Sequence, residues 1–440
     1  MDILNLEKLK VLQVKGTDND YCIIAESEDE PFIVCPHCFK MNQYVKHGYK
    51  KGQLFMDIAI HGKRVGVVID RKRYRCKACQ KTFLENLICM DDKRLMTKRL
   101  VEYIEKQTLS KDRSFVSIAD EIGIDEKTIR LIFKDMVKRL EEEHIYITPE
   151  WLGIDEIYLI NQPRAVLTNV KENTVLDILS NRKKATIVDY LKNIQDKETV
   201  KVVTMDMWNP YRDAVRLVLP HAKIVVDKFH VVRMANQCLE TVRKKLRKTL
   251  TSTQRKVLKN ERYILLKRQH DLTIQETINM EAWTKSFPIL GMAYDLKEAF
   301  YAIWDCDNKE QAKIVLEAWK RSIPEELISD FTPLLTALSN WDNEIYSYFD
   351  YRATNAYTES VNALIRAVNS VGRGYSFDVI RAKILFSEGI RKQVKIKYDR
   401  SLNSFSHSLY DTVAEPTFEY DNLDYGVDIS TLLKKLENGL

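Results

Sequence analysis

The chain has 440 residues, of which 45% are hydrophobic and 30% charged, and its formal net charge is +6. This length and composition predict a folded protein of two to four domains and exclude a low-complexity chain. No stretch reaches the roughly 18 uninterrupted apolar residues of a membrane helix, and residues 1–10 lack the pattern of a secretory signal, so we expect a cytoplasmic protein.

Two CxxC pairs stand in the first part of the chain. Each pair makes a tight knuckle that directs two thiolates at one ion, and two knuckles complete a tetrahedral site. The ligands are Cys35, Cys38, Cys76 and Cys79. Paired CxxC motifs favour metal ligation in a reducing compartment over a disulfide framework. We therefore predict a zinc ribbon domain over residues 1–91 with one structural Zn²⁺.

A basic run leads into the second knuckle and includes Arg73 and Arg75. Short strands are expected nearby, at residues 64–69 and 72–75. The basic side chains suit contact with a DNA backbone. Zinc ribbons also serve as protein docking modules, and the sequence leaves that alternative open.

The pattern turns helical between residues 92 and 145. We expect a helix at residues 93–108, a short helix at 117–123 that ends at Gly123, and a longer helix capped by Asp125. Two helices joined by a glycine turn make a helix-turn-helix domain. The outer face of the last helix is suited to a major groove, although many three-helix units simply pack. Its residues are Lys127, Thr128, Arg130 and Lys134.

Strands and helices alternate between residues 150 and 230. The expected strands are residues 152–160, 165–170, 175–179, 200–207 and 223–226, and the expected helices are residues 184–194 and 210–219. This order predicts the first part of an RNase H-like α/β catalytic core. A long helical stretch, residues 231–350, then interrupts the core and is too long to be a loop. The core resumes at residues 351–398, and residues 399–440 form an acidic C-terminal tail.

Three carboxylates are the candidate catalytic residues. Asp155 and Asp206 lie on the first and fourth predicted strands, and Glu359 lies on a predicted helix. Carboxylate oxygens suit Mg²⁺, and paired ions clamp the attacking and leaving oxygens of a phosphoryl displacement. A lone aspartate at a strand end is more often a cap or turn residue. Asp227 also ends a strand and is the alternative to Asp206.

Two further features surround these acids. Asn355, Glu359, Asn362 and Arg366 share one face of a helix, which suits a metal ligand among phosphate-binding donors or else a solvated surface. Trp208 and Tyr211 follow Asp206. For these two aromatics we favour core packing over stacking on a distorted base.

The helical stretch begins with a strongly basic segment. Residues 233–268 contain twelve Lys and Arg against two acidic residues. Such a segment suits a phosphate-binding surface, or else a solvated helix face. Its densest part contains Arg243, Lys244, Lys245, Arg247 and Lys248.

Taken together, the motifs resemble those of a bacterial DDE insertion-sequence transposase of the ISL-three family. They are CPHC, YRCKACQKTFLE, LGIDE, MDMWNPY, VVDKFHVVR, TNAYTESVNALIR and GRGYSFDVIRAKIL. The resemblance implies a catalytic triad of Asp155, Asp206 and Glu359. It also implies that Asp227 and His230, a D-x-x-H element, lie near the active site. The basic residue expected after the third acid is Arg366, seven positions on, which leaves its role open.

The resemblance implies a transposase that binds the terminal inverted repeats of its element. It would cleave and transfer DNA strands with two Mg²⁺ or Mn²⁺ ions, as a homodimer on double-stranded DNA, associated with the nucleoid. One alternative is a catalytically silent DNA-binding regulator derived from a transposase. Another is a structure-selective nuclease. A nucleotide-dependent enzyme is disfavoured because neither a P-loop nor a GxGxxG motif follows a strand.

Overall fold

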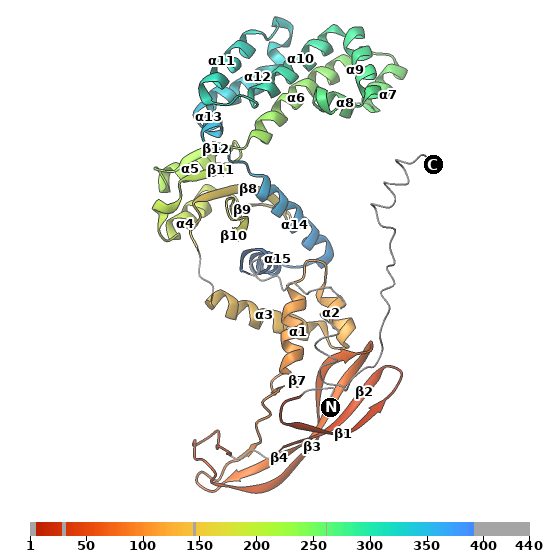
Figure 1. Ribbon diagram of the computed structural model, residues 1–440, viewed down its shortest axis with the longest axis vertical. Coiled ribbons are helices and arrows are strands. Elements are labelled where there is room, and N and C mark those ends of the chain that lie inside the picture. Colours follow the sequence, from red (N-terminus) through yellow and green to blue (C-terminus); the bar gives the residue numbers. More distant parts are fainter. Residues whose placement is uncertain (1–5, 29–31, 144–146, 261, 391–440) are drawn as a thin grey trace, which may run out of the picture. The chain divides into compact units, whose positions relative to one another are not determined.

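The computed structural model describes residues 6–28, 32–143, 147–260 and 262–390 (Figure 1). The predicted acidic tail lies outside these residues. The described chain is a multidomain α+β protein with two β-sheets and many helices, as the sequence predicts. None of the helices within the described ranges is long and apolar enough to cross a membrane.

The N-terminal sheet has the order β1-β2-β4-β3-β7-β6, with β5 paired to β4. Its strands are β1 (Leu9–Gly16), β2 (Asp20–Ser27), β3 (Tyr44–Ile60), β4 (Lys63–Cys76), β5 (Thr82–Leu84), β6 (Met90–Asp91) and β7 (Met96–Thr97). The two short strands expected between residues 64 and 75 are one continuous strand, β4. Val65, Val67 and Ile69 alternate into the core along it with a period of two. The alternation shifts within the basic run, where Tyr74 and Cys76 are the buried residues that follow Arg71.

Three helices follow: α1 (Lys98–Thr108), α2 (Phe115–Ile122) and α3 (Glu126–Glu143). The helix α1 begins later than predicted because the side chain of Thr97 caps it. Gly123 ends α2 in the left-handed conformation, with φ of 75°. As predicted, Asp125 caps α3: its Oδ1 accepts a hydrogen bond from the Lys127 backbone N–H at 2.7 Å.

The second sheet has five strands in the order β10-β9-β8-β11-β12. Its strands are β8 (Trp151–Leu159), β9 (Gln162–Asn169), β10 (Thr174–Ile178), β11 (Val202–Met205) and β12 (Lys223–Val226), and α4 (Lys184–Asn193) and α5 (Asn209–Val218) connect the later strands. The first three strands are antiparallel, whereas β11 runs parallel to both β8 and β12. These elements agree with the prediction to within a few residues.

The predicted helical stretch is helical. It consists of α6 (Lys228–Arg247), α7 (Ser252–Asn260), α8 (Arg262–Leu266), α9 (Ile274–Ser286), α10 (Pro288–Ile303), α11 (Lys309–Arg321), α12 (Glu325–Asn340) and α13 (Asp342–Tyr351). Both α10 and α12 pack on α6. Aromatic residues fill this core: the rings of Phe300 and Trp319 lie 4.8 Å apart. The same hydrophobic cluster includes Val225 and Val226 of β12, so the helices and this strand share one hydrophobic core.

After the helical stretch the chain returns to the second sheet. The helix α14 (Ala356–Gly372) packs on β8 and β9 (Figure 1). The helix α15 (Phe377–Ile384) follows and continues as a π-helical turn to Ile390. The segment at Arg373 and Gly374 breaks the helix, and both residues have positive φ.

Gly153 permits the close approach of α14 to the sheet. A Cβ at this position would lie 2.5 Å from Thr168 Oγ1 and 2.7 Å from Thr358 Oγ1. These two hydroxyls are buried and hydrogen-bonded to each other at 2.7 Å, which ties α14 to β9. The glycine of the GIDE motif is therefore part of what places the helix that bears Glu359.

Candidate active site

Three aspartates lie side by side near the carboxyl ends of the parallel strands β11 and β12 and on the adjacent strand β8. Met205 of β11 pairs with Ile154 of β8, so the next residues along the two strands, Asp206 and Asp155, are neighbours. Asp227 follows β12 directly, and its backbone N–H donates to the Met205 carbonyl at 3.0 Å. The parallel register thus brings together acids that are far apart in sequence.

These carboxyl groups lie in a poorly solvated place. Asp155 is 5% exposed and Asp227 is fully buried, whereas Asp206 remains partly exposed. Burial raises the pKa of Asp155 to about 7, and the negative charge of Asp206 acts in the same direction. A raised carboxyl pKa next to a second carboxylate is the electrostatic situation that a bound cation relieves.

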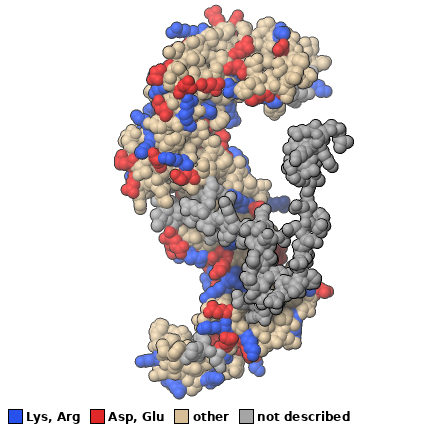
Figure 2. Space-filling view, viewed as in Figure 1, with Lys and Arg blue, Asp and Glu red and all other residues tan. Residues whose placement is uncertain are grey.

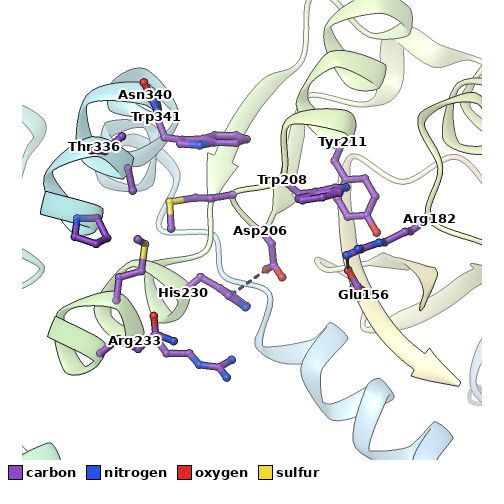
Figure 3. A pocket seen from close by; sticks show the side chains of 15 residues that line it. Glu156, Arg182, Asp206, Trp208, Tyr211, His230, Arg233, Thr336, Asn340 and Trp341 are labelled. Carbon is purple, nitrogen blue, oxygen red and sulfur yellow. Dashed lines mark hydrogen bonds and ion pairs between the residues drawn. The ribbon is translucent and has the colours of Figure 1, made fainter. Parts of the chain in front are cut away.

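His230, in the first turn of α6, faces Asp206 (Figure 3). Its Nδ1 lies 2.9 Å from Asp206 Oδ1 and 3.7 Å from Asp227 Oδ2. The contact with Asp206, followed by that with Asp227, raises the pKa of His230 to about 10. The D-x-x-H element therefore contacts Asp206 directly, and the cationic imidazole partly balances the cluster of acids.

The carboxylate oxygens at this site suit a divalent cation, and the His230 ring can join them as a ligand only in its neutral form. Ligand atoms of Asp206, Asp227 and His230 all lie within 4.8 Å of one another. Asp227 Oδ2 is buried without a hydrogen-bond donor, and Asp206 Oδ1 is buried beside the His230 ring. Buried oxygens without donors are costly unless a positive charge satisfies them, and carboxylate oxygens are the ligands that Mg²⁺ prefers.

Glu359 lies in the first turn of α14, and its side chain is exposed. Within the described ranges, its carboxylate is not gathered with those of Asp206 and Asp227. Its helix is nevertheless attached beside Asp155, because Asn362, one turn further on, donates from Nδ2 to Asp155 Oδ2 at 2.7 Å. The structure thus places the helix at the acids and leaves the Glu359 carboxylate facing solvent.

The polar stripe on α14 is not a uniform surface. Asn355 and Asn362 are buried, whereas Glu359 and Arg366 are exposed. Asn355 donates from Nδ2 to the Ile154 carbonyl at 3.1 Å, and its Oδ1 accepts from Thr204 Oγ1 at 2.7 Å. The expectation of a solvated or phosphate-facing stripe is wrong for the two amides, because they hold α14 against β8 and β11.

The four knuckle cysteines converge as predicted. The Sγ atoms of Cys35 and Cys79 are 3.7 Å apart and those of Cys38 and Cys76 are 3.6 Å apart, and all four lie within 4.8 Å of one another. Four thiolates at this spacing surround a tetrahedral Zn²⁺. The N-terminal domain therefore contains a structural zinc site.

Most of the basic residues predicted to contact DNA are accessible. Exposed side chains belong to Arg73, Arg75, Lys127, Arg130, Lys134, Lys244, Lys245 and Lys248, whereas Thr128 and Arg247 are half-buried. Three of these cations have acidic partners: Arg130 pairs with Glu126, Lys244 with Glu240 and Lys245 with Asp330. On the face in Figure 2, basic and acidic side chains are interspersed over the helices.

Arg243 is the exception and corrects a prediction. It is 3% exposed, and its guanidinium donates to both carboxylate oxygens of Glu240 and to the Leu258 carbonyl. A guanidinium buried with these partners braces α6 against α7 and does not face DNA. The charge run alone gave no sign of this, because it does not tell which basic residue turns inward.

Sequence reasoning also missed a cavity beside Asp206. Tyr211 is 1% exposed, as core packing predicts, but Trp208 is 40% exposed, so core packing is wrong for Trp208. The cavity lies between Trp208 and the helices α6 and α12. The only sequence signal was the WNPY segment directly after the aspartate.

A cluster of acids on a mixed sheet, joined to a domain with a four-cysteine zinc site, defines the class of this multidomain protein. Residues 152–384 match the sequence profile of the ISL3 transposases, and residues 31–79 match that of the zinc-finger of transposase IS204/IS1001/IS1096/IS1165. The transposase for insertion sequence element IS1001 of Bordetella parapertussis is 22% identical over 326 residues, covering 72% of this chain and 80% of that protein. The chain belongs to the ISL3 family of DDE transposases.

Proposed function

We propose that this protein binds the terminal inverted repeats of its insertion sequence and catalyses metal-dependent DNA cleavage and strand transfer. The observation that supports this best is the placement of Asp155 and Asp206 on neighbouring parallel strands, with α14 attached beside them through Asn362. We assign Asp155, Asp206 and Glu359 as the catalytic acids.

These three side chains would hold two Mg²⁺ or Mn²⁺ ions. When bound, such ions lower the pKa of an attacking water and stabilise the leaving 3′ oxygen. Asn362 orients the Asp155 carboxylate, and His230 orients that of Asp206. Glu359 is exposed at the same edge, where its free side chain can turn toward the acids. We assign Asp227 a supporting role, because its side chain also caps α6.

We further propose that the second sheet with α14 and α15 is an RNase H-like core, divided by the helical insertion. Three antiparallel strands followed by two parallel ones support this assignment. We propose that α2 and α3 form a helix-turn-helix, because a left-handed Gly123 joins them and α3 presents Lys127 and Lys134 to solvent. The domain limits proposed from the sequence follow this division.

We propose that the DNA-bound form is at least a dimer, because transposition must hold two element ends together. The protein would then act on nucleoid DNA in the cytoplasm. The exposed cations of α3 and α6 and of the zinc domain would contact phosphates, so end binding should weaken steeply with salt.

The test uses purified protein, the DNA flanking its gene, a target plasmid and Mg²⁺ or Mn²⁺. Wild type should nick the ends and join them to the target. Asp155→Asn and Glu359→Gln should bind the ends but do neither. The matched control is Glu310→Gln, which changes an exposed glutamate in the first turn of another helix, α11.

One observation favours a second candidate, the catalytically silent regulator: the Glu359 carboxylate stands apart from the acid cluster. Specific end binding by wild type without strand chemistry in either metal would establish that function instead. Loss of end binding together with cleavage in Glu359→Gln would contradict the catalytic assignment of Glu359.

A further inference from the structure

A cavity of about 520 Å³ opens beside Asp206 (Figure 3). One side is formed by residues directly after β11, and the other by α6 and α12 of the helical insertion. Its walls are largely apolar and include Met207, Trp208, Met234, Pro333 and Trp341. Its volume falls within the range of about 300–1,000 Å³ that holds small organic ligands. It is far too small for a duplex.

The Trp208 indole is held as an open platform in this cavity. The Arg182 guanidinium lies 4.5 Å from the centre of the Trp208 ring, and Arg182 also pairs with Glu156. With Arg182 covering one side, the 40% exposure of Trp208 leaves aromatic surface facing the cavity. An indole held by a guanidinium on one side offers the other to a planar partner.

The cavity is next to the place where the proposed chemistry occurs. Only one residue separates Asp206 from Trp208, and the backbone N–H of Trp208 donates to the Asp206 carbonyl at 2.7 Å. A phosphodiester held at Asp206 therefore has its own nucleoside within reach of the cavity. In a stacked duplex that base faces the helix interior, so it can fill the cavity only after leaving the stack.

The polar groups of the cavity suit a nucleotide. Arg233 of α6 lines it and is exposed, which gives a cation for a neighbouring phosphate. Gln237 and Asn340 also line it, and their amides can donate to and accept from a base edge. Aromatic stacking tolerates every base, whereas amide contacts add preference.

We propose that this cavity receives one nucleobase rotated out of the DNA stack beside the cleaved phosphodiester, with Trp208 as its stacking platform. The proposal rests on the proposed function and adds a binding site to it. Extrusion of a base has a cost that an aromatic platform offsets. Trp208 would thereby make distortion of the element end favourable at the moment of cleavage.

The experiment substitutes iodouracil at each position flanking the cut and irradiates the complex with wild-type protein. One position should cross-link strongly to Trp208, as mapped by mass spectrometry. Trp208→Ala should retain end binding but cleave about tenfold more slowly, the effect of losing one base–aromatic stack. Trp208→Phe should retain most of the rate. Tyr263→Ala is the matched control, because Tyr263 is exposed beneath Arg262 but lies outside the cavity.

A modified DNA substrate that restores the cleavage rate of Trp208→Ala distinguishes a base-binding role of Trp208 from a structural one. An abasic nucleotide at the cross-linked position removes the cost of unstacking, so it should restore much of the rate of Trp208→Ala. The proposal is overturned if wild type cleaves but no position cross-links to Trp208, or if no abasic position restores the variant. Absence of cleavage by wild type in Mg²⁺ and Mn²⁺ would instead overturn the proposed function, and this inference with it.

Discussion

Two of the acids, Asp155 and Asp206, are held by different neighbouring side chains. Asp155 is buried and accepts a hydrogen bond from Asn362, whereas Asp206 contacts His230. The two carboxylates are neighbours in register but have different partners. The fixed amide keeps Asp155 in one rotamer, and the imidazole gives Asp206 a positive neighbour. Removing the amide or the imidazole should therefore have different consequences.

Asn362→Ala tests the amide. The change leaves the buried Asp155 Oδ2 without its donor, which should reduce the free energy of unfolding by about 1–3 kcal/mol. Cleavage should fall further than folding explains, because a loosely held carboxylate binds metal poorly. Urea unfolding and cleavage rates measure the two effects. Asn369→Ala, two turns further along α14, is the control. Equal stability of Asn362→Ala and wild type would show that the hydrogen bond is unimportant.

At the scale of elements, α14 is placed by small residues and buried hydroxyls. Gly153→Ala should therefore destabilise the fold by about 1–3 kcal/mol, since the new methyl group collides with Thr168 and Thr358. Urea unfolding measures the loss. Gly16→Ala is the control for the glycine itself, because its φ lies outside the left-handed region and a Cβ there would meet only the Tyr21 side chain, at 3.3 Å. An unfolding free energy of Gly153→Ala equal to that of wild type would mean that α14 can shift without cost.

The helix α6 carries both a buried cation, Arg243, and exposed cations that the proposed function assigns to DNA. Arg243→Ala should destabilise the protein by about 3–5 kcal/mol, because it leaves the half-buried Glu240 without its main partner. Lys248→Ala, on the exposed end of the same helix, should leave stability unchanged. It should weaken DNA binding and reduce the magnitude of the log–log salt slope by about 0.9 if it contacts one phosphate. Urea unfolding and binding titrations at several salt concentrations distinguish these outcomes. A stable Arg243→Ala with weakened DNA binding would restore the original assignment of Arg243.

Some of this was predictable from the sequence and some was not. The strands that carry Asp155 and Asp206 follow from apolar runs that end at polar residues, and parallel pairing then makes the two acids neighbours. The zinc site follows from local spacing alone. The contact of Asn362 with Asp155 joins residues 207 positions apart, and no local pattern encodes it. Likewise, the exposure of Trp208 depends on where α12 packs.

At the scale of the whole described chain, the three helices α1–α3 and the second sheet share one hydrophobic cluster. It contains Phe115 and Phe133 together with Ile157 of β8 and Ile365 of α14. The Tyr375 hydroxyl accepts a hydrogen bond from the Phe115 backbone N–H at 2.9 Å. The packing therefore crosses the proposed boundary near residue 145. In the proposed function, DNA bound at α1–α3 and the acids of the second sheet would therefore be linked by this shared core.

Lys383 lies where α1–α3 pack on the second sheet, a contact we call the junction. Its titration makes the free energy of unfolding depend on pH. Lys383 is 1% exposed, and its Nζ donates to the carbonyls of Thr108 at 2.7 Å and Arg113 at 3.2 Å. Burial lowers the pKa of Lys383 from 10.5 to about 8. Between these two values the unfolded chain binds the proton more tightly than the folded one, so stability rises with pH. Below about pH 8 the lysine is charged in both states, and the full cost of its burial remains.

Lys383→Met isolates this effect, because methionine fills a similar volume without a charge. The variant leaves the two carbonyls without a donor, which gives a difference from wild type that does not depend on pH. In addition to this constant difference, the free energy of unfolding of wild type should rise relative to that of the variant by up to about 1.4 kcal/mol for each pH unit above about 8. Urea unfolding of both proteins between about pH 7 and about pH 10 measures the difference. Parallel stability curves would show that Lys383 titrates in the folded protein as it does in water, and that the junction opens enough to solvate it.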